Sequence, residues 1–302
     1  MKRTAFLFLV IFVSVSAFTI SSCKSSQSSA SKMLKFNLQK GQAYDYDMIT
    51  DFDQEIMGRE MKMSMDMGYS LDVNSDSGNI RIINTAINRI KMDMQMMGMR
   101  FSVDTEKPVS DADTTTMQGK LSFVFSKFGE VMKGKKFVMK VDKDGKVIDL
   151  SGLDQIFSSL PSSNGMDSAE RNKALRSLKE QINGKETSDQ FTELFSIFPE
   201  KEVKIDDTWE KDFEMTGKIP TKNHTVYKVK DIDGDMVTIS SKTKIESSDE
   251  NIKIDGTKNG IVIVDSRSGL VVNADYDYEI TFTASGFSFT MKGKEKVKGT
   301  AR

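Results

Sequence analysis

Apolar and polar residues alternate with a period of two over most of the chain, on both sides of a central stretch with a longer period. Leu34, Phe36 and Leu38 alternate with polar neighbours, and the pattern recurs in residues 61–67 and again after the central stretch. Such alternation is typical of antiparallel strands that are buried on one face. Asp-Gly at residues 144–145 separates two such runs and predicts a tight hairpin turn.

Two stretches in the middle of the chain switch to helical spacing. Residues 121–132 carry apolar side chains on one helical face, and residues 151–197 carry three such groups in succession. We expect Gly184 to end the second helix of that group, Ser188 to cap the third and Pro199 to stop it. The sequence therefore predicts an α+β fold in which curved antiparallel sheet surrounds a central helical segment. Periplasmic lipoprotein carriers have a sheet wrapped around helices, which is an analogy of fold alone.

The two strand regions, residues 34–150 and 198–302, resemble each other in three places that occur in the same order. The segments that lead to Tyr44 and to Trp209 match first, and a hairpin and a later turn match after them. Repetition of this kind predicts two duplicated halves around the helical segment, residues 151–197. The alternative is that any two antiparallel sheets share such hairpin patterns, and the sequence leaves both open.

The N-terminus has the pattern of an exported lipoprotein. A basic start, Met1-Lys2-Arg3, precedes an apolar run that ends at Ile20-Ser21-Ser22-Cys23. A basic start, an apolar core and small residues at the cleavage point form a secretory signal. The last four residues resemble the lipobox of bacterial lipoproteins. That resemblance implies that Cys23 becomes an N-terminus carrying diacylglyceryl and, usually, an N-acyl chain such as palmitate. The alternative is an ordinary signal peptide cleaved near Ser22.

Cys23 is the only cysteine, so a secreted form of the chain has no disulfide. We expect residues 1–22 to be the signal peptide and residues 23–33 to be an acylated, flexible tether. Two or more acyl chains hold a protein stably at a membrane. By resemblance to other lipoproteins, Lys24 in place of Asp disfavours the inner membrane and favours the outer membrane. The tether has no nearby acidic residue, which favours the periplasmic face over the cell surface.

Two segments carry a resemblance to a known family. Phe36–Tyr44 and Phe198–Trp209 have aromatic, Gly and Pro residues at spacings that resemble a family of uncharacterised lipoproteins from Bacteroidota. The resemblance extends over most of the mature chain. Its motifs are structural, so it implies a location in the cell envelope and no particular activity.

Composition and motifs disfavour several kinds of chemistry. The formal net charge is −1, so the chain has no basic surplus to attract nucleic acid. His224 is the only histidine, and its place at the start of a strand favours an exposed side chain over a triad or metal site. Asp142–Gly145 and Asp231–Asp235 lack the ligand spacing of calcium loops, so we expect hairpin turns there. We expect a protein that is not an enzyme and uses no metal or cofactor.

Methionine is the unusual feature of the chain, which has 20 of them. Because strand side chains alternate between faces, two methionine-rich strands each present their methionines on one face. These candidate ligand-binding residues are Met61, Met63, Met65, Met67, Met92, Met94 and Met96. They predict a deformable core face, a cavity for an apolar or lipid-like ligand, or a thioether site for Cu(I).

The function that the sequence favours is non-catalytic binding of an apolar or lipid-like ligand by a membrane-anchored envelope lipoprotein. The alternative is a structural or interaction component of an envelope complex, with a protein partner. A Met-based Cu(I) binder and an envelope enzyme rank below these two.

Overall fold

The alternating runs form long antiparallel strands in the computed structural model. The structure describes residues 31–56, 58–76, 78–96, 98–107, 116–153, 184–216, 220–247, 252–284 and 286–302. Residues Ser31–Arg302 make one compact unit. Within the described ranges no helix is both long enough and apolar enough to cross a membrane.

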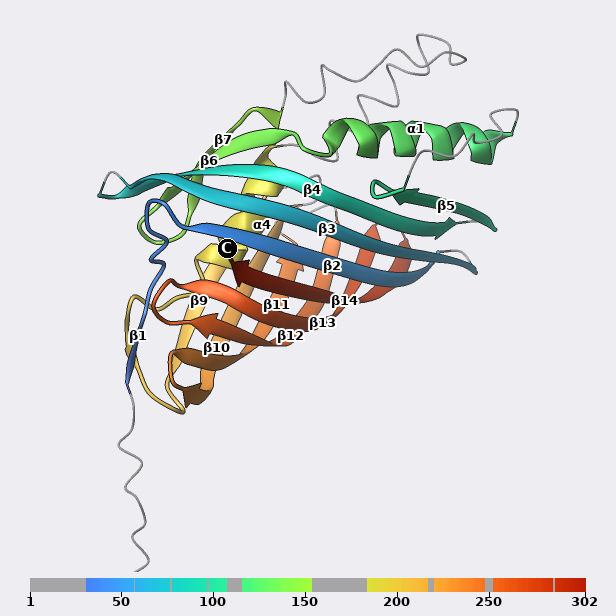
Figure 1. Cartoon of the computed structure of the whole chain (residues 1–302). Coiled ribbons are helices and arrows are strands. Elements are labelled where there is room, and N and C mark those ends of the chain that lie inside the picture. The colour runs from blue at the N-terminus through green and yellow to red at the C-terminus, as the bar shows by residue number, and fades with distance from the viewer. Residues whose placement is uncertain are drawn as a thin grey trace, which may run out of the picture. The chain divides into compact units, whose positions relative to one another are not determined.

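One large antiparallel sheet contains most of the described strands (Figure 1). Its order is β7-β6-β4-β3-β2-β14-β13-β12-β11-β10-β9, and β5 pairs with β4 beside β6. The strands of the first half are β2 (Ala43–Ile56), β3 (Arg59–Asp76), β4 (Ile80–Met96), β5 (Met99–Asp104), β6 (Lys136–Asp142) and β7 (Val147–Ser151). Those of the second half are β9 (Thr208–Met215), β10 (Thr221–Asp233), β11 (Met236–Ser247), β12 (Lys253–Asp265), β13 (Leu270–Ala284) and β14 (Phe287–Ala301).

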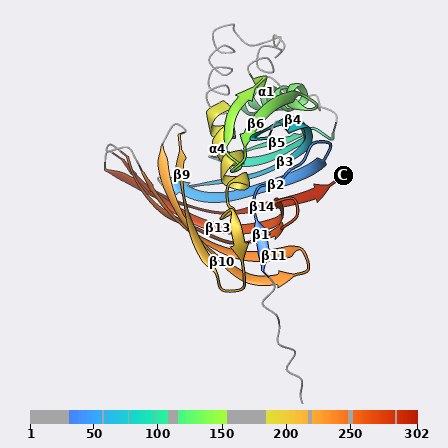
Figure 2. The same cartoon turned by 90° about the vertical axis from the view of Figure 1, so that its left-hand side faces the viewer.

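Two helices and a small strand pair complete the described fold. Helix α1 (Met117–Met132) packs on β5, and helix α4 (Gly184–Phe195) lies against the inner face of the curved sheet (Figure 2). Strand β1 (Lys32–Leu34) pairs with β8 (Lys201–Val203) in a separate two-stranded sheet. The concave face of the large sheet is therefore partly filled by α4.

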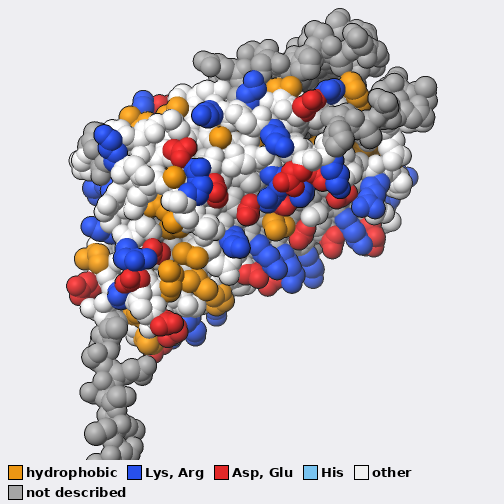
Figure 3. Space-filling model, viewed as in Figure 1, with side chains coloured by type: hydrophobic (Ala, Val, Ile, Leu, Met, Phe, Trp, Pro, Cys, Tyr) orange, Lys and Arg blue, Asp and Glu red, His pale blue; other side chains and the backbone are white. Residues whose placement is uncertain are grey.

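Strand alternation explains why the sheet has one apolar and one charged face. Fully buried side chains such as Leu71, Ile83 and Val262 belong to one hydrophobic core with apolar residues of α4, and each contributes roughly 1.5–3 kcal/mol by burial. On the convex face, β14 and β13 form cross-strand ion pairs such as Lys292 with Glu279 and others further along. Charged side chains spread over β2, β3 and β14 on this face (Figure 3). The inner, concave face of the sheet is thus the buried, mostly apolar one.

Aromatic side chains of α4 connect the helix to the sheet. Phe191 lies 5.5 Å from the ring of Tyr69 and 6.4 Å from that of Phe137, measured between centroids. Phe195 lies 5.4 Å from the ring of Phe36. These contacts bring the segment before β2, strands β3 and β6 and the helix into one core.

The expected α+β class is wrong, because the described chain is mostly antiparallel strand with two helices. Strands such as β3, with 18 residues, are far longer than the usual five or six. Most of the described chain therefore lies in strands, and the two described helices pack against them. The helix expected at residues 121–132 is present in α1, and the hairpin around Asp144-Gly145 is present between β6 and β7.

The expected boundaries of the last helix are also wrong. Gly184 lies in α4 instead of ending a helix, and Ser188 lies within α4, where its hydroxyl donates to the carbonyl of Val147. The helix ends at Phe195, before Pro199. Ser188 bonds across to the sheet, and this tertiary contact replaces the local capping bond that its position suggested. The two helices expected before Gly184 lie almost wholly outside the described residues.

The two strand regions are consecutive meanders within a single sheet, joined side by side where β2 pairs with β14. Tyr44 lies in the first strand of one meander and Trp209 in the first strand of the other. The registers differ in detail, because Trp209 pairs with Tyr227 whereas Tyr44 pairs with Leu71. The duplication of the two halves stays a prediction.

Candidate functional site

A cavity of about 390 Å³ opens between the concave face of the sheet and α4. Its wall comes from strands of both halves, mainly β2, β3 and β9 to β14, together with one side of the helix. Its apolar lining consists of Met48, Met65, Met67, Leu194, Met215, Ile245, Ile254, Ile280, Phe282 and Met291. This volume lies within the usual range for small-molecule sites.

Strand register brings the methionines of distant segments together. Met48 of β2 lies opposite Met67 of β3, and Ile280 of β13 lies opposite Met291 of β14. Residues that pair directly in an antiparallel sheet point to the same face. These four thioether and aliphatic side chains therefore share one wall of the cavity.

Two glycines let aromatic rings lie flat along this wall. A side chain at Gly260 would overlap the ring of Tyr276, and one at Gly293 would overlap the ring of Tyr278. Each glycine is the direct cross-strand partner of the tyrosine that covers it. Larger residues at these positions would push both rings into the cavity.

The structure places only some of the predicted methionines at the cavity. Met65 and Met67 line it. Met61 and Met63 lie further along the same face of β3, half-buried, where the sulfur of Met61 accepts a hydrogen bond from Gln54 at 3.3 Å. The sulfur of Met67 similarly accepts from the hydroxyl of Tyr69 at 3.3 Å.

The methionines of β4 lie on the same inner face. Met92 pairs with Met65, Met94 with Met63 and Met96 with Met61. The side chains of Met92 and Met94 are half-buried, and the side chain of Met96 lies outside the described residues, as does Cys23. Ligand binding by the methionines, whether of an apolar molecule or of Cu(I), stays a prediction.

Sequence reasoning missed a charged group in the cavity wall. Lys258 of β12 is 12% exposed, and its ammonium lies 2.9 Å from Glu295 of β14 and 3.4 Å from Glu193 of α4. The same ammonium lies 4.4 Å from the centre of the Tyr276 ring. Burial acts to lower the pKa of Lys258, but the two carboxylates outweigh it and raise this pKa well above its usual value.

One signal in the sequence could have located Lys258. Gly256 and Gly260 flank it at two-residue spacing, so all three lie on one face of β12. Glycines on the inner face of a strand mark a place where another side chain approaches closely. A lysine between them is therefore set among large neighbours, here Tyr276 and Ile280.

The other candidate sites of the sequence are structural. His224 is half-exposed, and its two charged neighbours are Asp212 at 2.8 Å and Glu210 at 3.8 Å. Asp142 accepts from backbone amides of its own turn, as a hairpin requires. Among the described residues no group of three or more His, Cys, Asp or Glu side chains could hold a metal ion.

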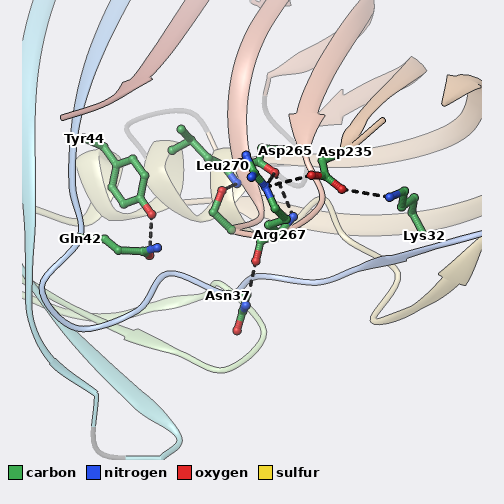
Figure 4. A network of polar contacts seen from close by, with 9 residues as sticks. Lys32, Asn37, Gln42, Tyr44, Asp235, Asp265, Arg267 and Leu270 are labelled. Carbon is green, nitrogen blue, oxygen red and sulfur yellow. Dashed lines mark hydrogen bonds and ion pairs between the residues drawn. The ribbon is translucent and has the colours of Figure 1, made fainter. Parts of the chain in front are cut away.

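Asp235 belongs to an ion-pair network that fixes the N-terminal segment (Figure 4). Its carboxylate contacts Lys32 at 3.0 Å and Arg267 at 3.3 Å, and Arg267 also contacts Asp265. The backbone carbonyl of Arg267 accepts from the side chain of Asn37 at 2.8 Å. These contacts attach the segment from Lys32 to Asn37, which includes the end of the expected tether, to the turns at the ends of β10 and β12.

Comparison with known sequences identifies the family. Residues 78–271 match a family described as "Family of unknown function (DUF6263)". The chain belongs to this family. No curated protein sequence matches the chain significantly.

A solved structure resembles this DUF6263 chain in fold. A structure described as "Lipid-protein interactions in lipovitellin" aligns with a TM-score of 0.51 and 10% identity over 88% of this chain and 26% of that one. The chain thus spans about a quarter of that protein's length. The translocator domain of autotransporter NalP from Neisseria meningitidis aligns over 88% of this chain and 90% of its own, with a TM-score of 0.33 and 5% identity.

Proposed function

We propose that this DUF6263 protein is a lipid-anchored envelope lipoprotein that binds an apolar, lipid-like molecule in its concave cavity and catalyses no reaction. The observation that carries the proposal is the cavity itself. Its wall is mostly apolar, and it opens on the inner face of a sheet whose outer face is covered with charged side chains. A concave apolar site with a few polar groups is the usual form of a small-molecule site.

The methionine-rich wall suits a ligand of variable shape. Met48, Met65, Met67 and Met291 have unbranched, flexible side chains with polarisable sulfur. Such surfaces repack around different ligands, whereas branched side chains impose one shape. Acyl chains, which differ in length and unsaturation, are ligands of this kind.

The fold comparison is in keeping with this proposal. The lipovitellin structure is described by its lipid–protein interactions, and its similarity to this chain extends over 88% of this chain. At 10% identity the similarity is one of fold alone, and lipid binding by this chain is our proposal.

Attachment to the envelope rests on the sequence. The lipobox at Ile20–Cys23 supports acylation of Cys23, and the resemblance to Bacteroidota lipoproteins supports a place in the envelope. Lys24 favours the outer membrane, with the fold in the periplasm. The membrane is then a partner through the lipid, and the short tether keeps the cavity close to it.

A cavity-filling substitution tests ligand binding. Met65→Trp replaces a thioether chain with a bulkier indole that occupies part of the cavity. We therefore expect it to weaken binding of the neutral fluorophore N-phenyl-1-naphthylamine at least about tenfold, which corresponds to a loss of ~1.4 kcal/mol of binding free energy. Ser64→Trp is the matched control, because Ser64 is exposed on the other face of β3. Failure of the parent protein to bind the probe, or equal binding by Met65→Trp, would contradict the proposal.

A further inference from the structure

We propose that the ligand of this cavity carries a cationic head group, such as a primary or quaternary amine, that lies against Glu295 and Glu193. This inference rests on the proposed function and names the class of amphiphile that the site takes. It comes from the charge of the cavity wall, the arrangement of that charge along β14, and the contacts already made by Lys258.

The cavity wall carries one more negative charge than positive charge. Among the described residues that line it, the charged side chains are Lys258, Glu193 and Glu295. One ammonium thus faces two carboxylates, at 3.4 Å and 2.9 Å. One cationic group on a ligand would bring the wall to neutrality.

Burial strengthens the effect of this surplus negative charge on a ligand. The side chains of Glu193 and Glu295 are only 22% and 21% exposed. In contrast, Lys292 and Glu279 on the convex face form a one-to-one pair in which both side chains are more than half-exposed. Charges away from water interact more strongly, and an uncompensated buried charge is costly. A ligand cation that reaches these carboxylates therefore gains more than it would on the outer surface.

The contacts of Lys258 disfavour an anionic head group. Its ammonium already contacts both carboxylates and the ring of Tyr276. A carboxylate or phosphate would have to displace one of these partners while lying beside the remaining negative charge. A cation meets no such competition, and the ring of Tyr278 in the same wall can attract it further.

The site separates a polar end from an apolar end along one strand. Met291, Gly293 and Glu295 follow each other at two-residue spacing on the inner face of β14. Met291 pairs with Ile280 and Glu295 pairs with Tyr276. Four residues of strand span ~13 Å at about 3.3 Å per residue. An amphiphile lying along β14 would thus place its head at Glu295 and its chain over Met291 and Ile280.

Three single-chain compounds of equal length test the head group. Binding of dodecylamine, dodecanol and dodecanoic acid to the full protein is measured by calorimetry at pH 7, below micelle-forming concentrations. We expect the amine to bind at least about tenfold more tightly than the acid, as a charge-assisted hydrogen bond predicts. The alcohol should lie between them.

Substitution of each carboxylate assigns the preference to the site. Glu295→Gln and Glu193→Gln each leave Lys258 one carboxylate partner, so the variants should fold and lose most of the preference for amine over acid. Glu279→Gln is the matched control, because it removes one carboxylate from the convex face of the same sheet. It should leave the preference unchanged.

The outcomes separate this inference from the proposed function. If none of the three compounds binds, the proposed function fails. If all three compounds bind equally, the cavity is an apolar site with no head-group preference. If the acid binds best, the site prefers an anion. In either case the proposed cationic head group is wrong. The inference also fails if the preference survives in both Glu295→Gln and Glu193→Gln, or if Glu279→Gln abolishes it.

Discussion

The indole nitrogen of Trp209 donates a hydrogen bond of 2.7 Å to the carbonyl oxygen of Ile197, just after the end of α4. Trp209 lies in β9, at the edge of the sheet, and its ring stacks on Tyr227 with centroids 5.4 Å apart. One side chain thus joins the edge strand to the segment that holds α4 in the concave face. The wall of the cavity depends on that position of the helix.

Trp209→Phe should destabilise the fold while it keeps an aromatic ring beside Tyr227. Loss of the N–H leaves the carbonyl of Ile197 without its donor in a buried place, at a cost of about 1–3 kcal/mol. Urea denaturation followed by circular dichroism measures the change. Phe287→Leu is a control, because Phe287 is 61% exposed and should change stability by roughly 0.5 kcal/mol or less. Equal stabilities for the two variants would show that the Trp209 bond contributes nothing.

His224 should titrate above the usual histidine range. Its hydrogen bond to Asp212 of the neighbouring strand raises the pKa of the imidazole above 6.5. A pKa that is higher in the folded state contributes stability fully below the unfolded pKa, and that contribution is lost as the pH rises through the folded pKa. Because the chain has a single histidine, NMR observes this titration directly. Asp212→Asn should lower the measured pKa.

Glu214→Gln is the matched control for this titration. Glu214 is exposed on the same face of β9 as Asp212, but it pairs with Lys222 and not with His224. Its substitution should leave the pKa of His224 nearly unchanged. An unaltered pKa in Asp212→Asn would mean that the contact seen between the two side chains does not persist in solution.

The sequence supports the local elements of this fold better than the relations between them. Met65 and Met67 could be placed on one strand face from alternation alone, because the period of two is a property of a single segment. The flanking glycines could mark Lys258, but its partners Glu193 and Glu295 could not be predicted, because they lie on a helix and a strand far away in the chain. The capping role predicted for Ser188 is wrong for the same reason, since its hydroxyl donates to the carbonyl of Val147 across the core instead of capping its own helix.

Cys23→Ala should release the protein from the membrane fraction or block its processing. The expectation follows from the lipobox and from the absence of any other cysteine in the sequence. A fold attached by acyl chains alone loses its anchor when the acylated residue is removed. Fractionation after salt and carbonate washes measures the effect, with Ser25→Ala in the tether as the control. Full retention of Cys23→Ala with the membrane would show that something other than lipid holds the protein.

Lys258→Met should destabilise the fold much more than removal of a lysine from the convex face. The substitution leaves the mostly buried carboxylates of Glu193 and Glu295 without their counter-ion, and breaking a buried ion pair costs about 3–5 kcal/mol. Lys292→Met is the control, because Lys292 is 68% exposed and its pair is worth roughly 1 kcal/mol at most. Urea denaturation at pH 7 measures both.

A triple variant and the pH dependence identify the cause of that loss. Adding Glu193→Gln and Glu295→Gln to Lys258→Met removes the uncompensated charges, so most of the lost stability should return. The pKa of Lys258 is raised in the folded state. Its contribution should therefore be fully present at neutral pH, where the carboxylates are ionised, and should decline as the pH rises above the unfolded lysine pKa of about 10.4. If the triple variant is no more stable than Lys258→Met, the loss comes from packing of the lysine stem against Tyr276, and the charge surplus of the cavity wall has little energetic weight.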